Sequence, residues 1–238
     1  MRLAALALMA LVACGGGQPA AESAPESNTR SEESFAAYNQ GAKALAAGRR
    51  EAAVKDFARA VELDAGNHAA WYQLGVHDER AGRWTDATGR LQKAADLRPK
   101  NPVYRHHLGR SLLESGNAKA AGVELEASLA LEPGQYRTHY FLGRARERLG
   151  DFRGAARAWT EAARLEPCFV PAFERLSALY ESWGFGAQAM AVVEAGLQCS
   201  SPMDGRPRWR LHAVCARVRE QQNQIEASLG CYDRAIAE

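Results

Sequence analysis

The chain has 238 residues, of which 47% are hydrophobic, enough for one large or two small globular domains with a core. Its formal net charge of +2 is too small for a nucleic-acid-binding protein, which needs an excess of lysine and arginine to meet the phosphates. The composition therefore predicts a soluble, globular protein and excludes nucleic acid as a partner class.

The first residues differ in composition from the rest of the chain. Residues 1–13 begin with a positive charge at Arg2 and continue as an uncharged apolar run from Leu3 to Ala13. This run is about half of the ~20 residues that a membrane-spanning helix requires. Residues 1–13 are therefore expected to be a cleaved signal peptide for export and not an anchor helix.

The four residues from Leu11 to Cys14 read Leu-Val-Ala-Cys and resemble the lipobox of bacterial lipoproteins. The resemblance implies that Cys14 becomes the first residue of the mature protein and carries lipid, a diacylglyceryl thioether and an acylated amine of the palmitate kind. Each buried CH₂ group contributes ~0.8 kcal/mol, so these chains together hold a protein on a membrane. The alternative is an ordinary secretory signal, because Ala13 also suits a standard cleavage site.

Residues 14–33 are expected to form a flexible, lipidated tether. After the cysteine they read GGGQPAAESAPESNTRSEE, with no large apolar side chain to offset the entropy of ordering. A coil of about 20 residues spans roughly 25 Å. Gly15 stands where an aspartate would, in enteric bacteria, resemble a signal for retention in the inner membrane. We therefore expect the periplasmic face of the outer membrane, with the inner membrane left open.

A spacing of 34 residues brings small, bulky and proline residues into register over residues 34–203. The columns are Gly41, Gly75, Gly109, Gly143 and Ser177; Gly48, Gly82, Gly116, Gly150 and Gly184; Ala53, Ala87, Ala121, Ala155 and Ala189; Phe57, Leu91, Leu125, Trp159 and Val193; Ala60, Ala94, Ser128, Ala162 and Gly196; and Pro99, Pro133 and Pro167. These columns resemble the tetratricopeptide repeat, which recurs every 34 residues.

The resemblance implies an all-α fold, a right-handed superhelical solenoid of about six helical hairpins whose first helices line a concave side. Apolar or small residues at i, i+3, i+4 and i+7 of the first segments independently predict helices. The expected units are 34–67, 68–101, 102–135, 136–169, 170–203 and a degenerate sixth unit at 209–238. In that last unit Asn223 replaces the turn glycine.

The repeat columns also predict how each hairpin is built. Small residues at the positions of Gly75 and Ala87 allow two helices to approach closely, a glycine such as Gly82 forms the left-handed turn, and proline stops the second helix. The sixth unit ends at Glu238 without the polar helix that usually caps such arrays. We expect its apolar end to be covered by a partner protein or by a second copy, as a homodimer.

Four cysteines remain once Cys14 is set aside. An exported protein enters an oxidising compartment, where thiols pair. Cys168 precedes the first helix of the fifth unit and Cys199 ends its second helix, while Cys215 and Cys231 lie at facing levels of the sixth unit. We predict the disulfides Cys168–Cys199 and Cys215–Cys231; the alternative is that these are small, buried core thiols.

Two positions of each first helix, one turn apart, face the concave side in the repeat family. The residues that we predict to form a peptide-binding groove there are Tyr38, Tyr72, His106, Arg110, Tyr140 and Arg144. Aromatic rings with neighbouring arginines suit an extended or helical peptide that carries acidic groups. The alternative is that these rings and alkyl chains only pack between neighbouring hairpins.

Catalysis, cofactors and metal binding are not expected. The sequence has no phosphate-binding loop, nucleophile elbow, paired-histidine metal motif or Cys-x-x-Cys. His106 and His107 are adjacent, but neighbouring residues on a helix point about 100° apart, which does not suit a shared metal. Histidines with ordinary hydrogen bonds are the expected state.

The sequence as a whole predicts a membrane-anchored scaffold that binds another protein and is not an enzyme. The lipobox, the tether and about six repeats together resemble the type IV pilus biogenesis lipoproteins that pilot secretin subunits to the outer membrane. The expected partner is then a secretin subunit. The alternative is an adaptor that docks cell-wall hydrolases or other envelope enzymes.

Overall fold

The structure, a computed structural model, describes residues 25–199 and 208–237. These residues form twelve α-helices and no strands. The helices are α1 (Pro25–Ala46), α2 (Arg50–Leu63), α3 (His68–Arg80), α4 (Trp84–Leu97), α5 (Pro102–Glu114), α6 (Ala118–Leu131), α7 (Tyr136–Arg148), α8 (Phe152–Leu165), α9 (Val170–Ser182), α10 (Gly186–Leu197), α11 (Trp209–Gln221) and α12 (Ile225–Ala237). Each odd-numbered helix pairs with the next one, so the described residues form hairpins 1 to 6 in chain order.

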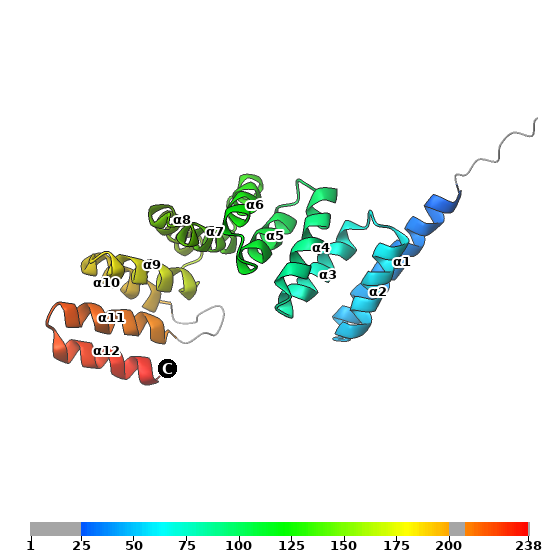
Figure 1. The fold of residues 1–238 in the computed structure, drawn as a ribbon. Helices are drawn as coiled ribbons and strands as arrows, with labels where there is room; N and C mark the ends of the chain where they lie inside the picture. Colours follow the sequence, from blue (N-terminus) through cyan, green and yellow to red (C-terminus); the bar gives the residue numbers. More distant parts are fainter. Residues whose placement is uncertain (1–24, 200–207, 238) are drawn as a thin grey trace, which may run out of the picture.

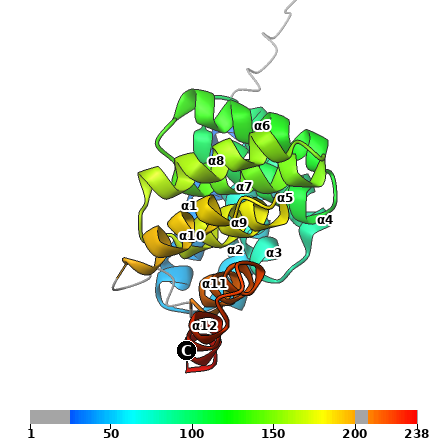
Figure 2. The same ribbon diagram turned by 90° about the vertical axis from the view of Figure 1, so that its left-hand side faces the viewer.

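The hairpins stack one after another, from α1 and α2 at one end to α11 and α12 at the other (Figure 1). Viewed along the stack, they fan around an axis and do not form a straight column (Figure 2). Successive first helices touch one another, as α3 does α5, α5 does α7 and α9 does α11. The first helices therefore lie on the inner side of the curve, and the all-α superhelix expected from the sequence is confirmed.

The turn inside each hairpin requires a residue in the left-handed backbone region. The five turn glycines have positive φ angles of 75°, 71°, 97°, 78° and 76° at Gly48, Gly82, Gly116, Gly150 and Gly184. Hairpin 6 uses Asn223 instead, with φ of 58°. Asparagine tolerates this region better than most side chains, so the sixth hairpin keeps the same turn without glycine.

A second glycine column allows the two helices of a hairpin to approach closely. A Cβ atom on Gly75 would lie 2.6 Å from Cγ of Leu91, and one on Gly109 would lie 2.6 Å from Cγ of Leu125. Both leucines are completely buried, so neither can move aside freely. The packing of the hairpin thus explains why glycine stands at these positions.

The N-terminal tether is shorter than the sequence predicted. Residues 25–33 were expected to belong to a flexible segment, but α1 begins at Pro25. A helix nucleus that is fixed by packing at Ala37 and Ala44 extends at little cost, because each added residue gains a hydrogen bond. Residues 25–33 can therefore be helical although they lack an apolar face of their own. The signal peptide, Cys14 and the remaining tether lie outside the described residues.

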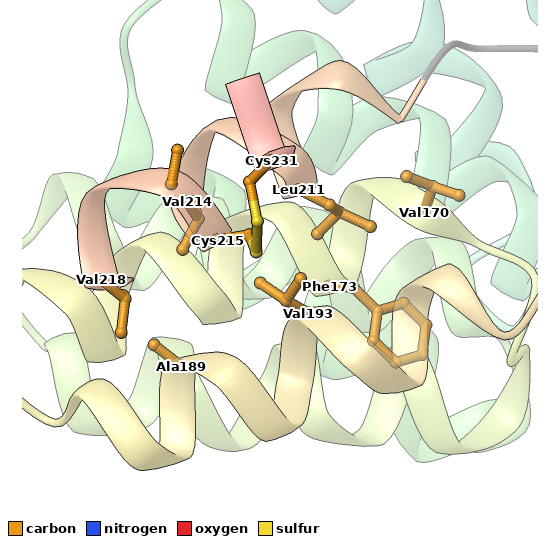
Figure 3. Packing of buried hydrophobic residues seen from close by; sticks show 10 residues of the cluster. Val170, Phe173, Ala189, Val193, Leu211, Val214, Cys215, Val218 and Cys231 are labelled. Atoms are coloured by element: carbon orange, nitrogen blue, oxygen red, sulfur yellow. A yellow bond between two sulfur atoms is a disulfide. The ribbon is translucent and has the colours of Figure 1, made fainter. Parts of the chain in front are cut away.

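Hairpins 5 and 6 share one hydrophobic core (Figure 3). Leu211 and Val218 of α11 are fully buried against α9 and α10, where Val193 is 1% exposed. Burying a side chain of this size contributes roughly 1.5–3 kcal/mol. In contrast, α12 leaves Ile225, Leu229 and Ile236 54%, 57% and 82% exposed, and the expected contact of this end with a partner or a second copy stays a prediction.

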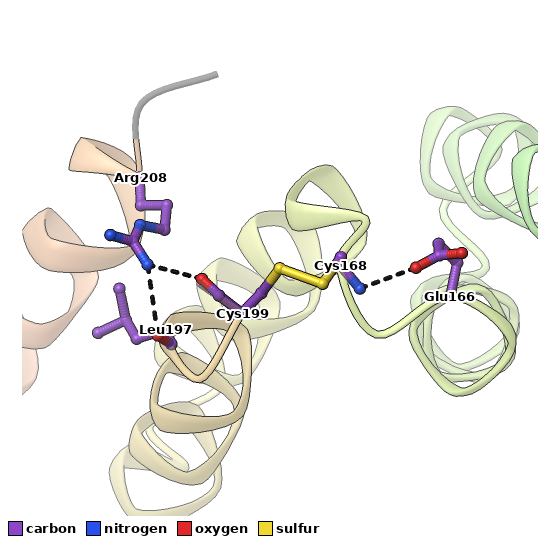
Figure 4. The surroundings of a disulfide bond; sticks show 5 residues. All are labelled: Glu166, Cys168, Leu197, Cys199 and Arg208. Atoms are coloured by element: carbon purple, nitrogen blue, oxygen red, sulfur yellow. Dashed lines mark hydrogen bonds between the residues drawn. A yellow bond between two sulfur atoms is a disulfide. The ribbon is translucent and has the colours of Figure 1, made fainter. Parts of the chain in front are cut away.

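Both cysteine pairs that the sequence singled out lie at disulfide distance, with Sγ–Sγ separations of 2.14 Å for Cys168–Cys199 and for Cys215–Cys231. The first pair joins the residue before the N-cap of α9 to the residue beyond the C-cap of α10 (Figure 4). Beside it, Arg208 donates to the carbonyl oxygen of Cys199 at 2.9 Å. The second pair joins α11 to α12 inside the core of Figure 3.

Candidate binding pocket

A pocket of about 560 Å³ opens on the inner side of hairpins 3 and 4. The residues that line it come mainly from α5 and α7, with others from the starts of α4 and α9. Its lining residues are Trp84, His106, His107, Arg110, Glu114, Arg137, Tyr140, Phe141, Arg144, Phe169 and Pro171. Four of the six residues predicted for the groove are among them: His106, Arg110, Tyr140 and Arg144.

The 34-residue period and the helix register bring these four residues together. His106 and Arg110 are four residues apart on α5, and Tyr140 and Arg144 are four apart on α7, so each pair lies on one side of its helix. The register of α5 is fixed at its start, where the Asn101 side chain accepts hydrogen bonds from the backbone N–H groups of the next turn. Stacking then places the two pairs side by side.

The ring of Phe141 lies between two arginines. The guanidinium carbon of Arg110 is 5.5 Å from the ring centroid and that of Arg144 is 5.6 Å from it. Arg110 also lies 5.7 Å from the centroid of the Trp84 ring. Contacts of this kind hold a guanidinium group in place through the negative face of the ring, so both arginine side chains are ordered before any ligand arrives.

The charge of Arg144 is already neutralised. Its two terminal nitrogens donate to the two carboxylate oxygens of Glu114 at 2.6 and 3.3 Å, a bidentate pair. Only 17% of the Arg144 side chain is exposed. Arg148 also approaches Glu114, at 3.6 Å. Arg144 therefore shapes the pocket, and its guanidinium is not free to recognise a ligand.

Arg110 lies farther from a carboxylate than Arg144 does. Its nearest carboxylate is that of Glu79, 3.9 Å away. That carboxylate already accepts hydrogen bonds from Nδ1–H of His107 at 2.6 Å and from the Ser111 hydroxyl at 2.9 Å. The Glu79 side chain is 2% exposed, and each of its carboxylate oxygens accepts a hydrogen bond from within the protein. The Arg110 side chain is 34% exposed and lines the pocket.

Arg137 is a pocket residue that the sequence reasoning missed. Its side chain is exposed. Among residues 25–199 and 208–237, no carboxylate lies within the 4.0 Å of an ion pair with Arg137. Its Nε donates to the Tyr136 hydroxyl at 3.0 Å. It lies one helical turn before Tyr140, outside the two positions of each first helix that were considered. Trp84 was not predicted because it begins a second helix, α4, and the repeat pattern places groove residues on first helices.

His106 lines the pocket without adding charge. The Thr138 hydroxyl donates to Gln135 at 2.7 Å, so its oxygen accepts from Nδ1–H of His106, also at 2.7 Å. Burial, reinforced by His107, Arg110 and Arg137, lowers the pKa of His106 from 6.5 to about 3. The ring is therefore neutral at ordinary pH and acts as an apolar and hydrogen-bonding wall.

Tyr38 and Tyr72 do not line the pocket. The Tyr38 ring packs on Phe57, with centroids 5.6 Å apart, and the Tyr72 ring stacks on Tyr104 at 4.8 Å. The packing alternative raised from the sequence therefore describes these two residues. Tyr72 still supports the pocket, because its hydroxyl is 3.2 Å from Nε2 of His107 and helps to hold that ring. Burial raises the pKa of Tyr72, with the Glu79 carboxylate adding to the effect.

The described residues contain neither a cluster of metal-ligating side chains nor a membrane-spanning helix. No three His, Cys, Asp or Glu side chains of these residues gather in a way that suits a metal ion. No helix in the described part of the chain combines the length and the apolar character that crossing a bilayer requires.

Solved structures with similar folds are repeat proteins. The pilF protein of Pseudomonas aeruginosa has a TM-score of 0.69 and 18% identity, with 85% of this chain and 90% of that chain covered. The MamA protein of Desulfovibrio magneticus RS-1 has a TM-score of 0.66 and 21% identity, with 73% and 98% covered. YrrB, described as a repeat protein with an unusual peptide-binding site, has a TM-score of 0.65 and 17% identity, with 82% and 95% covered. At these identities the likeness shows the fold.

Sequence comparison points to the same repeat. The BBSome complex member bbs-4 of Caenorhabditis elegans is 28% identical over 141 residues, which are 56% of this chain and 30% of that protein. The chain thus spans about 30% of the length of this relative. Models of the tetratricopeptide repeat match residues 44–110 and 106–169, together more than half of the chain. The chain therefore belongs to the tetratricopeptide repeat proteins.

Proposed function

We propose that this chain is a lipid-anchored scaffold that binds a partner protein at the periplasmic face of the bacterial outer membrane and performs no catalysis. The observation that carries the proposal is the pocket of about 560 Å³, in which aromatic rings and the side chains of Arg110 and Arg137 meet on the inner side of the solenoid. Concave sites with apolar walls and a few directed polar groups are typical of binding sites. The Leu-Val-Ala-Cys sequence that ends at Cys14 supports the lipid anchor.

The partner that we propose is a secretin subunit, which the lipid on Cys14 would carry to the outer membrane. Two observations support this choice. The lipobox-like sequence, the tether and the repeats resemble type IV pilus biogenesis lipoproteins, and the pilF protein of Pseudomonas aeruginosa shares the fold. The peptide-binding site named for YrrB supports a peptide segment as the bound part of the partner.

The alternative proposal uses the same pocket and anchor for a different client. An adaptor would hold cell-wall hydrolases or other envelope enzymes near the membrane. The pocket favours neither client by shape alone, so the two proposals are separated by what happens to each client when the scaffold is removed.

The test is deletion of the gene followed by gel analysis of unboiled envelope fractions. The secretin proposal predicts that multimers disappear and monomers accumulate, and that the wild-type chain restores the multimers. A Cys14→Ala variant, which keeps the whole solenoid but lacks the acylation site, should fail to restore them. Normal multimers in the deletion strain would contradict the secretin proposal, and displaced hydrolase activity in that strain would support the adaptor.

A further inference from the structure

We infer that the pocket on α5 and α7 binds an extended acidic segment of its partner, with Arg110 and Arg137 holding a carboxylate side chain within that segment. The inference rests on the proposed protein-binding function and names the chemistry of the ligand. It also reassigns the charge recognition, which the sequence placed on Arg110 and Arg144.

The balance of charge around the pocket is positive. Arg144 is matched by Glu114 through its bidentate pair. Arg110 and Arg137 remain, and the acidic group nearest to Arg110, Glu79, is engaged by His107 and Ser111. Arg110, whose nearest carboxylate is 3.9 Å away, and Arg137, which forms no ion pair with the described residues, therefore border one space, and a carboxylate of the ligand complements them.

The position of Arg137 indicates a segment that continues past it. Arg137, His106 and His107 line both the main pocket and a neighbouring pocket of about 390 Å³, which extends toward Val103 and Gly134. Because the two pockets share these three residues, one extended segment can cross Arg137 and occupy both. An internal acidic side chain fits this arrangement better than a chain terminus, which would occupy one pocket only.

The aromatic wall provides the second part of recognition. Tyr140 and Phe141 line the pocket from α7, and Phe169, the N-cap residue of α9, also lines it. The rings of Tyr140 and Phe169 are 5.2 Å apart and edge to face, which leaves an apolar surface beside the arginines. A ligand with an aromatic or aliphatic residue near its acidic residue would use both features.

The test measures fluorescence anisotropy with labelled twelve-residue peptides in which glutamate, tyrosine and serine alternate. Both ends of each peptide are blocked, so that only side chains can carry charge. The full mature protein in detergent is expected to bind the glutamate peptide at least tenfold more tightly than the same peptide with glutamine in place of glutamate. Added salt should weaken the binding, because the paired charges are partly exposed.

Variants of Arg110 and Arg137 test whether these two residues cause the preference for the glutamate peptide. Arg110→Gln and Arg137→Gln should each weaken binding of the glutamate peptide about tenfold, the size expected for one lost charge-assisted contact. Arg59→Gln removes the same charge from the exposed side of α2 and should leave binding unchanged. Circular dichroism is the check that each variant is folded; Arg137 is exposed, so its substitution should leave the core intact.

Two outcomes would overturn the inference: equal binding of the glutamate and glutamine peptides, or no binding by either of them. These outcomes leave the proposed function standing if deletion still removes the secretin multimers. Failure of the proposed function would instead appear in the deletion strain as normal secretin multimers and envelope enzymes at their usual location.

Discussion

Hairpins 1 to 4 and hairpins 5 and 6 reach the same fold by different means. The first four follow the 34-residue period and use glycine wherever the paired helices approach closely, as at Gly75 against Leu91. The last two have Ser177 and Ala216 in that column, and each carries one cysteine pair at disulfide distance. Close packing of backbones holds the first region, and covalent links reinforce the second. Stability should therefore respond to different changes in the two regions.

Replacing the cysteines by serine should have the largest effect. A closed loop of the size formed by these pairs contributes about 3 kcal/mol, mainly by restricting the unfolded chain. Hydrogen exchange measured by mass spectrometry should show faster exchange in α9–α12 of Cys168→Ser/Cys199→Ser and of Cys215→Ser/Cys231→Ser, with α3–α6 unchanged, because repeats depend mostly on their neighbours. A uniform increase in the hydrogen-exchange rate along the whole chain would contradict this difference between the two regions.

The substitution Gly109→Val should destabilise the first region by about 2–3 kcal/mol, because its Cβ would meet the buried Leu125. Urea unfolding measures the loss. The control is Gly122→Ala in α6, where a Cβ has no neighbour within 4 Å, and which should gain about 0.5–1 kcal/mol from helix propensity. Equal effects of the two substitutions would show that close approach is not what requires Gly109.

Acid should destabilise the hairpins that form the pocket through His106. Its pKa falls from 6.5 to about 3 on folding, so the unfolded chain binds the proton more readily and stability is lost as pH drops below 6.5. One such group contributes at most about 1.4 kcal/mol per pH unit in this window. Urea unfolding at pH 7 and pH 5 should show a smaller pH effect for His106→Gln. The same pH effect in both proteins would contradict the assignment to His106.

The turns provide the smallest expected effect. Gly150→Ala places a Cβ at a φ angle of 78° and should cost about 1 kcal/mol, measured as a lower thermal midpoint. Gly150→Asn should cost less, because hairpin 6 already uses Asn223 at φ 58°. If alanine and asparagine proved equally costly, the turn in hairpin 6 would need another explanation.

The sequence predicted the features that depend on backbone geometry. A left-handed turn and a close approach of two helices each require glycine or a small residue. The roles of Gly82 and Gly75 can therefore be predicted from a single sequence. The predicted boundary between the tether and the first helix was wrong, because a helix can extend from a packed nucleus without an apolar pattern. The roles of the arginines could not be predicted, since Arg144 and Glu114 are thirty residues apart and their pairing depends on how hairpins 3 and 4 meet.

The central claim is that a partner protein binds the inner pocket, and site-specific photocrosslinking in living cells tests it most directly. A crosslinking amino acid at Tyr140, in the pocket, should form an adduct with one envelope protein, and Arg137→Gln should weaken that adduct. The same group at Val123, 60% exposed on the second helix of hairpin 3, should form none. An adduct from Val123 together with none from Tyr140 would contradict the account.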